Sequence, residues 1–289
     1  MKRILYLLIL LSHPIIYDPV YAVQPYSLSF GRESLLLGSG SALTLSGSLM
    51  MRKLKPPDPD KLNREKVFFM DKIALNRSSK KNALYSDITL SICMTLPPIV
   101  SVTNDAWDTS LIMYGESIFL VSGLSLMTKV FVHRARPYAY QAGNSPWDIS
   151  SPEASASFFS GHTSLAFNCA VFSALLYQKY HPDSPWIKPV WISTLTLATA
   201  TGVFRITSGK HFPTDVITGA AVGSITGWFI LRLHEFRDVE NSVEHIAPPP
   251  AMTIFSSAGA ILGLFKPGFT SGRSWSLDFQ SGVALRYRF

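Results

Sequence analysis

The sequence predicts an all-α helical bundle with a small β element at the C-terminus. Five apolar segments have helical length, namely residues 84–102, 109–132, 157–177, 191–206 and 216–233. Most of them approach the roughly 20 residues that a helix needs to cross a bilayer. Polar clusters lie at the ends of these segments, and alternating antiparallel helices bring such ends together on one face of a bundle.

The N-terminus has the pattern of a secretory signal. Lys2 and Arg3 precede the apolar residues 4–11, and the small-residue sequence Val20-Tyr21-Ala22 follows. This arrangement predicts a signal peptide over residues 1–22 that is cleaved after Ala22. The alternative is an uncleaved membrane anchor. Either way we expect the protein in the cell envelope, associated with a membrane, with its functional site facing the periplasm or the exterior.

Residues 23–70 are predicted to form an N-terminal extension and linker. Residues 35–51 are rich in Gly, Ser and Leu, which fits either a membrane-contacting helix or an irregular packing segment. Residues 52–59 form a charged linker broken by prolines. Residues 71–86 are expected to form an amphipathic entry helix and turn, which opens a helical domain over residues 71–240.

The sequence leaves open whether the helices span a membrane. The mean hydropathy is only +0.20, and Asp87, Asp105, Asp108 and Glu116 interrupt the early apolar segments. The bundle is therefore either multi-spanning or globular.

Three cations at the ends of apolar segments indicate an anion site. Lys129 lies near the end of the second apolar segment, and Arg136 follows that segment and directly precedes Pro137. Arg205 lies near the end of the fourth apolar segment. Lysine supplies a point charge and arginine a forked pair of donors, which match the oxygens of a phosphoryl group. His133 and Arg134 lie between the first two cations and are interpreted as flanking charges.

A histidine and an aspartate complete this pattern. Pro213 suits the first turn of a helix, so His211 is expected at a helix N-terminus, where anions are favoured. Asp215 lies four residues after His211, on the same side of the turn, and can hold one imidazole nitrogen so that the other acts as a nucleophile. Ser160 and Gly161 open another apolar run, where their polar groups can hold phosphate oxygens while His162 protonates a leaving group.

These residues resemble the signatures of the type 2 phosphatidic acid phosphatase superfamily, which includes lipid phosphatases, class A acid phosphatases and vanadium haloperoxidases. The signatures are Lys, six residues, Arg-Pro; then Pro-Ser-Gly-His; then Ser-Arg, five residues, His, three residues, Asp. The chain keeps every spacing from Lys129 to Asp215. It departs at Phe159, where the family has Pro, and at Phe204, where the family has Ser.

The resemblance implies a role for each matching residue. His211 forms a transient phosphohistidine, Asp215 orients it, and His162 is the general acid and then the base. The phosphoryl oxygens are bound by Lys129, Arg136, Ser160, Gly161 and Arg205. No metal or other cofactor is expected, and the sequence has no carboxylate cluster around these histidines that favours one.

The sequence favours a membrane-associated phosphatase that removes a phosphate monoester or pyrophosphate from a lipid, of the phosphatidic acid, polyprenyl pyrophosphate or lipid A type. The alternatives are a soluble periplasmic nonspecific acid phosphatase, a vanadate-dependent haloperoxidase and a nonenzymatic membrane protein. The net charge of +7 fits an anionic substrate or lipid surface. Nucleic acid is not expected as a partner, because no nucleic-acid-binding motif is present.

The C-terminal tail is predicted to leave the helical pattern. Apolar residues alternate with polar ones over residues 274–289, which is the period of a β-strand. Residues 241–289 are therefore expected to form a linker and a β-hairpin or tail, with residues 252–264 as a candidate second strand. A membrane-spanning β-barrel is not expected from so short a segment, because such barrels need about eight strands.

Overall fold

A computed structural model describes residues 24–141, 145–235, 274–278 and 284–288. The contacts divide the chain into two units, residues 1–244 and residues 245–289, which are described separately. The predicted signal peptide lies outside the described residues, as does most of the predicted C-terminal linker.

The first unit is a bundle of α-helices, which confirms the predicted fold class. Each of the five predicted apolar segments forms one helix, and residues 35–51 belong to a sixth helix rather than to an irregular segment. The helices described are α2 (Phe30–Met51), α3 (Lys80–Ser101), α4 (Trp107–Val132), α5 (Gly161–Tyr180), α6 (Ile187–Thr207) and α7 (Pro213–His234).

Two helix starts differ from the sequence prediction because a serine caps the helix. The expected entry helix over residues 71–86 is instead a short 3₁₀ helix, Asp71–Ala74, followed by α3. Ser79 is the N-cap of α3, since its side chain accepts a hydrogen bond from the Asn82 N–H. Ser160 caps α5 in the same way, so residues 157–160 precede that helix rather than belong to it.

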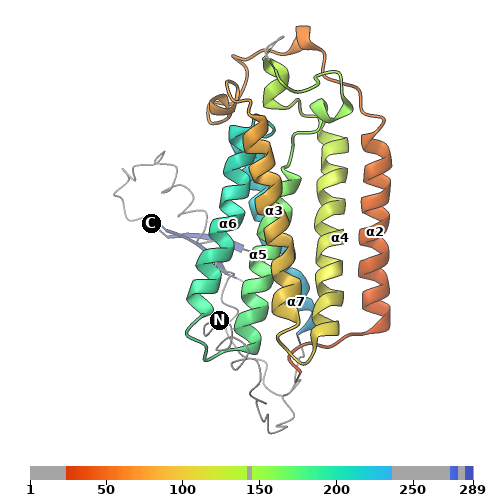
Figure 1. Cartoon of the computed structure of the whole chain (residues 1–289), viewed down its shortest axis with the longest axis vertical. Helices are drawn as coiled ribbons and strands as arrows, with labels where there is room; N and C mark the ends of the chain where they lie inside the picture. Colours follow the sequence, from red (N-terminus) through yellow and green to blue (C-terminus); the bar gives the residue numbers. More distant parts are fainter. Residues whose placement is uncertain (1–23, 142–144, 236–273, 279–283, 289) are drawn as a thin grey trace, which may run out of the picture. The chain divides into compact units, whose positions relative to one another are not determined.

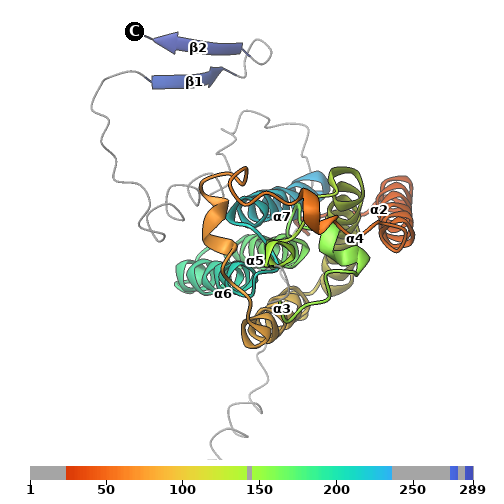
Figure 2. The ribbon, with the colours of Figure 1, turned by 90° about the horizontal axis from the view of Figure 1, so that it is seen from above.

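Helix α5 is the centre of the bundle. Seen from above, it is surrounded by α3, α4, α6 and α7, while α2 packs on the outside of α4 (Figure 2). The residues of α5 are buried along most of its length. A helix enclosed in this way holds the start of its first turn in a fixed position relative to its neighbours.

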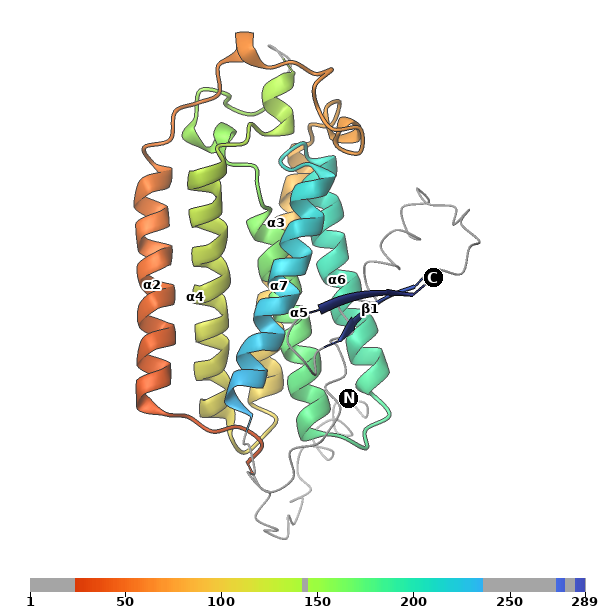
Figure 3. The ribbon, with the colours of Figure 1, turned by 180° about the vertical axis from the view of Figure 1, so that it is seen from behind.

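The predicted polar clusters meet at one end of this bundle. The ends of α4 and α6 lie beside the starts of α5 and α7, and the loops that join them gather at the same end (Figures 1 and 3). The start of α3 lies there too, because the Ser79 N–H donates to the Ser208 carbonyl. Alternating helix directions therefore bring together residues from distant parts of the chain.

Among the described residues, four helical stretches are long and apolar enough to cross a membrane: Phe30–Met51, Lys80–Ser101, Trp107–Tyr140 and Pro213–His234. Large apolar side chains point outward from these stretches. Leu35, Ile99 and Phe131 are each more than half exposed. Such outward faces fit contact with lipid, where apolar exposure has no cost.

Glycines in α7 allow it to pack closely against α5. A Cβ atom at Gly219 would lie 2.7 Å from the Ser160 carbonyl oxygen, and one at Gly223 would overlap the Ser164 carbonyl. Small residues at this spacing let two helix backbones approach each other, as they commonly do in membrane bundles. The close approach fixes the start of α7 against the start of α5.

The second unit contains a two-stranded antiparallel hairpin. β1 (Ser274–Asp278) pairs with β2 (Ala284–Arg288), with Ser274 opposite Arg288 and Leu277 opposite Leu285. The alternating tail therefore pairs with itself. The other candidate strand, residues 252–264, lies outside the described residues.

The packing of α5 on α7 predicts opposite effects for two glycine substitutions. Gly223→Ala is expected to destabilise the bundle by about 1–3 kcal/mol, because the added methyl group forces the helices apart. Gly115→Ala is the matched control, because a Cβ atom there meets nothing within 4 Å. That variant is expected to gain up to about 1 kcal/mol from helix propensity. Thermal unfolding in detergent measures both, and equal effects would contradict the close packing.

Candidate active site

Backbone hydrogen bonds tie the three predicted motifs to one another. The Tyr138 N–H, next to the first motif, donates to the Gly209 carbonyl at 3.1 Å. The Ser160 N–H, in the second motif, donates to the Asp215 carbonyl at 3.0 Å. Gly209 has a φ of +73°, and a Cβ atom there would overlap the Arg77 carbonyl, so this turn requires glycine.

His211 is buried with one ring nitrogen fixed. Its side chain is 1% exposed, and Nδ1 lies 2.8 Å from the Ser157 carbonyl oxygen. Because a carbonyl only accepts, Nδ1 carries the proton and Nε2 keeps a free lone pair. Burial and the nearby Arg136, Arg205 and Lys129 hold the pKa of His211 well below its usual range. The imidazole is therefore neutral at neutral pH, as a nucleophile must be.

Asp215 acts on His211 mainly through Ser157. Its Oδ2 is 3.6 Å from His211 Nδ1, which is beyond hydrogen-bond distance. The same oxygen accepts hydrogen bonds from the Ser157 hydroxyl at 2.5 Å and from the Phe212 N–H at 2.9 Å. Sequence reasoning assigned Asp215 a direct bond to the imidazole. In the structure the aspartate instead holds the serine whose carbonyl fixes the ring.

Arg134 joins two buried carboxylates and is part of the site. One terminal nitrogen donates to Asp215 at 2.5 Å and the other to Asp71 at 2.7 Å. Asp71 is buried and accepts the N–H and hydroxyl of Thr214, the second residue of α7. The interpretation of Arg134 as a flanking charge, like His133, is therefore wrong. No local pattern distinguishes the two residues, because the partners of Arg134 are 63 and 81 positions away in the sequence.

Two arginines supply buried donors beside His211. Arg136 and Arg205 are 5% and 6% exposed. Arg136 is held by its Nε, which donates to the Glu153 carbonyl at 2.8 Å. The Nε of Arg205 is buried and has no hydrogen-bond partner among the described residues. An unpaired charged donor is costly in a protein interior, so this group fits an anion that binds there.

Lys129 and the start of α5 form another part of the site. A Cβ atom at Gly161 would lie 3.0 Å from the Lys129 Nζ, so the absence of a side chain leaves room for the ammonium group. Ser160 is fully buried, and its hydroxyl accepts from the Thr163 hydroxyl at 2.9 Å. All eight residues predicted from the sequence thus lie at the end of the bundle where the three motifs meet.

A carboxylate from α3 lies beside the second histidine. Asp87 Oδ1 is 2.9 Å from His162 Nε2 and 3.6 Å from a terminal nitrogen of Arg205. The carboxylate is an anion next to two groups assigned to phosphate chemistry. Sequence reasoning treated Asp87 only as a charge that interrupts an apolar segment, because nothing near it in the sequence carries the motif.

The loop between the first two motifs packs against the third. The Trp147 indole N–H donates to the Ser208 carbonyl at 3.2 Å, and its ring lies 3.5 Å from the Lys210 Nζ. Burial lowers the pKa of Lys210 to about 8. Lys210 is thus held by an aromatic face rather than by an acid. These contacts hold the loop beside the third motif.

The two departures from the family signatures have different surroundings. Phe159 is buried and packs against Phe158, with ring centroids 6.2 Å apart. Phe204 is half-buried on α6 and packs against Tyr85 of α3 at 5.5 Å. Phe159 is therefore a core residue, whereas Phe204 leaves part of its ring accessible.

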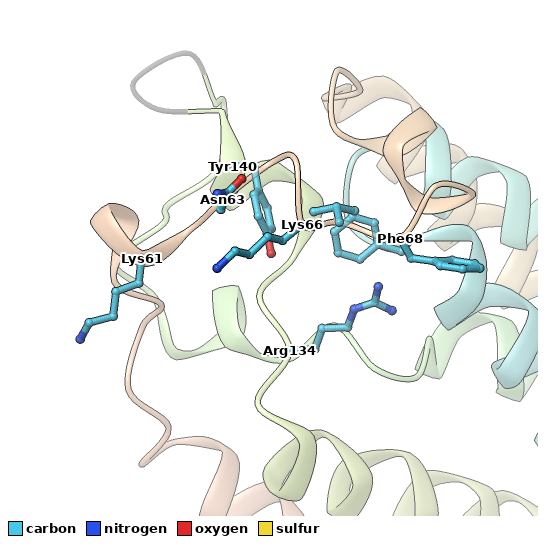
Figure 4. Close-up of a pocket in the computed structure, with 8 residues that line it drawn as sticks. Lys61, Asn63, Lys66, Phe68, Arg134 and Tyr140 are labelled. Atoms are coloured by element: carbon cyan, nitrogen blue, oxygen red, sulfur yellow. The ribbon is translucent and has the colours of Figure 1, made fainter.

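A basic pocket of about 400 Å³ lies on another side of Arg134. Figure 4 shows Lys61, Lys66 and Phe68 around it, with Arg134 below Tyr140. None of the eight residues predicted from the sequence lines this pocket. Arg134 connects it with the site, since the same guanidinium binds Asp215.

The comparisons with known proteins agree with the motifs. Residues 110–238 match the sequence profile of the PAP2 superfamily. The resemblance inferred from the motifs is thus confirmed over this part of the chain. Over 124 residues, 43% of this chain, it is 31% identical to a lipid A 1-phosphatase from Porphyromonas gingivalis. Over 74 residues, 26% of this chain, it is 38% identical to the bacitracin transport permease protein BcrC of Bacillus licheniformis. These matches span only 24% and 32% of the relatives' lengths.

One solved structure is also similar to this chain. It is the first transmembrane PAP2-type phosphatidylglycerolphosphate phosphatase from Bacillus subtilis. The similarity has a TM-score of 0.46 at 22% sequence identity, and it covers 67% of this chain and 94% of that one.

Replacing Arg134 is expected to damage the site far more than replacing its neighbour. Arg134→Gln leaves Asp71 and Asp215 without their shared cation, which costs about 3–5 kcal/mol for a buried pair. We expect a lower melting temperature and at least about a hundredfold loss of turnover through the mis-oriented His211. His133→Asn is the control, because His133 is exposed with a φ of 51°, which asparagine tolerates. Equal activity of the two variants would restore the flanking-charge interpretation.

Proposed function

We propose that the protein is a membrane-associated phosphatase that hydrolyses a phosphate monoester or pyrophosphate on a lipid. One observation carries the proposal. A neutral, buried His211, with Nδ1 fixed by a carbonyl and Nε2 unprotonated, stands next to three cations and no described acid competes for that nitrogen. Such an imidazole is poised to attack an anionic phosphorus centre that the cations attract.

The reaction proceeds in two displacements. His211 Nε2 attacks phosphorus, a P–N bond forms, and the P–O bond to the lipid breaks while His162 gives its proton to the leaving oxygen. A water molecule then attacks phosphorus, His162 accepts a proton from that water, and the P–N bond breaks to release phosphate. During the first step positive charge develops on the His211 ring, and the Asp215 carboxylate at 3.6 Å from Nδ1 stabilises it.

The cations stabilise the phosphoryl group as it transfers. Arg136 and Arg205 are buried, so their attraction to phosphate oxygens is weakly screened. Lys129 adds a third charge next to the first turn of α5, where free N–H groups also favour an anion. Because side chains supply all of this charge, the chemical step needs no metal ion.

The position of the site supports a lipid substrate. The predicted residues lie at the ends of helices whose outer faces expose large apolar side chains. An acyl or isoprenoid chain gains about 0.8 kcal/mol for each CH₂ group that it buries there. The similarity to a lipid A 1-phosphatase supports the same substrate class. We place the site on the periplasmic or external side of the membrane, in keeping with the predicted signal peptide.

The mechanism predicts a phosphoenzyme that depends on His211. Brief mixing of the wild type with ³²P-labelled substrate, followed by alkaline quenching, is expected to trap an acid-labile label on the protein. His211→Ala is expected to lose the label and all turnover. Asp215→Asn should retain the histidine but lose at least about a hundredfold in kcat. Substantial turnover by His211→Ala would sink the mechanism.

The substrate proposal predicts a dependence on chain length. We expect kcat/KM to rise from p-nitrophenyl phosphate to short-chain and then long-chain phosphatidic acid in one detergent, and polyprenyl pyrophosphate and lipid A extend the panel. Equal kcat/KM values across chain lengths would instead favour a general acid phosphatase.

The initial rate should persist in EDTA and fall with vanadate, which resembles the five-coordinate phosphoryl group. Halide oxidation by vanadate-loaded protein would favour the haloperoxidase.

A further inference from the structure

Three buried side chains converge at the end of the bundle opposite the phosphate site. Glu33 lies in the first turn of α2, Glu116 lies in α4, and His234 is the last residue of α7. The start of α7 belongs to the phosphate site, and a helix of 22 residues is about 33 Å long. The starts of α2 and α4 and the end of α7 lie together at this end in Figure 3.

The three side chains offer ligand atoms around one point. His234 Nε2 lies 3.1 Å from Glu33 Oε1 and 3.1 Å from Glu116 Oε2, and the three atoms lie within 4.8 Å of one another. Ligand atoms about 2.0–2.1 Å from a tetrahedral zinc ion are separated by about 3.3 Å. The observed separations are close to that value.

These buried groups lack the hydrogen-bond partners that polar atoms need in a protein interior. His234 and Glu116 are both 0% exposed. Neither close contact of His234 Nε2 meets hydrogen-bond geometry, and Nε2 and both Glu116 carboxylate oxygens have no hydrogen-bond partner among the described residues. A proton on Nε2 would point between the two carboxylates and satisfy neither well. A metal ion on the lone pair of Nε2 would contact both.

The surrounding contacts orient each group as the partners of metal ligands do. His234 Nδ1 donates to the Ile230 carbonyl at 2.7 Å, which fixes the proton on Nδ1 and leaves Nε2 as the ligand atom. Arg32 donates to Glu33 Oε1 from two nitrogens, and the Ser29 N–H donates to Oε2 at 2.7 Å. The Ser27 N–H donates to the His234 carbonyl, which ties the start of α2 to the end of α7.

We propose that Glu33, Glu116 and His234 form a binding site for a divalent transition metal, with Zn²⁺ as the ion that fits best. One imidazole and two carboxylates suit zinc, whereas calcium and magnesium rarely accept an imidazole nitrogen. The site joins three helices far from His211. It therefore stabilises the bundle and takes no part in the transfer of phosphate.

The test measures metal content and stability in the full chain. The protein is purified in detergent with a tag that does not chelate metals, loaded with ZnCl₂ and separated from free zinc. Its zinc content is then measured by mass spectrometry. We expect one zinc ion per wild-type chain and a melting temperature that rises with the logarithm of free zinc. Loading with Co²⁺ should give visible absorption bands that mark nitrogen and oxygen coordination.

Matched variants identify the ligands and separate this site from the phosphatase. Glu116→Gln and His234→Gln keep similar side-chain size and are expected to weaken zinc binding at least tenfold and to remove the response of the melting temperature. The exposed Glu65→Gln is the control and should bind zinc as the wild type does. His211→Ala should lose turnover yet keep its zinc, so failure of the proposed phosphatase activity leaves this test intact.

Other outcomes would overturn the metal site. A wild type that retains no zinc or cobalt, and whose melting temperature is the same in zinc and in EDTA, would show instead an imidazolium held between two carboxylates. Zinc bound equally by the wild type and by His234→Gln would place the ion elsewhere. If the variants fail to fold, the metal content and melting response of the wild type decide the question alone.

Discussion

The buried carboxylate of Asp215 is the group on which the organisation of the site depends. It is fully buried and accepts hydrogen bonds from Arg134, Ser157 and the Phe212 N–H. An ionised carboxylate survives in a protein interior only when charge and donors compensate for lost water. Here the compensation comes from three different segments of the chain, so satisfying one charge brings those segments together. The same contacts set the carbonyl of Ser157 against His211 and thereby choose which ring nitrogen is free.

The site also concentrates positive charge, and this limits what it can bind. Lys129, Arg136 and Arg205 lie near His211, an arrangement that repels further cations and protons. Burial and that repulsion together keep His211 neutral, and in the proposed mechanism a phosphate dianion relieves the repulsion. In that mechanism the bound anion also makes it easier for His162 to hold the proton that the leaving oxygen needs. The three cations thus contribute both to the proposed affinity for phosphate and to the neutral state of His211.

The helical packing supplies the rigidity that such a site requires. Gly219 and Gly223 let α7 approach the backbone of α5, and Gly209 permits the tight turn that precedes α7. These glycines place the start of α5 and the start of α7 side by side. At the other end of α7, Glu33 and Glu116 meet His234, so each end of this helix carries its own polar cluster within an apolar bundle. A charged group within such a bundle remains buried only where its partners are built in.

The sequence by itself determined the helices and the eight residues of the candidate phosphate site. Apolar runs of helical length specify α3 to α7, and the fixed spacings from Lys129 to Asp215 mark the candidate site, because both are local patterns along the chain. Only the tertiary structure decided how those residues work together. Arg134 differs from His133 because it reaches Asp71 and Asp215, and Asp87 matters because α3 packs beside α5. The cluster of Glu33, Glu116 and His234 likewise comes from three helices that are distant in sequence. Contacts of this kind leave no periodic or motif signal, since each partner is a single polar residue whose neighbours are set by packing rather than by its own segment.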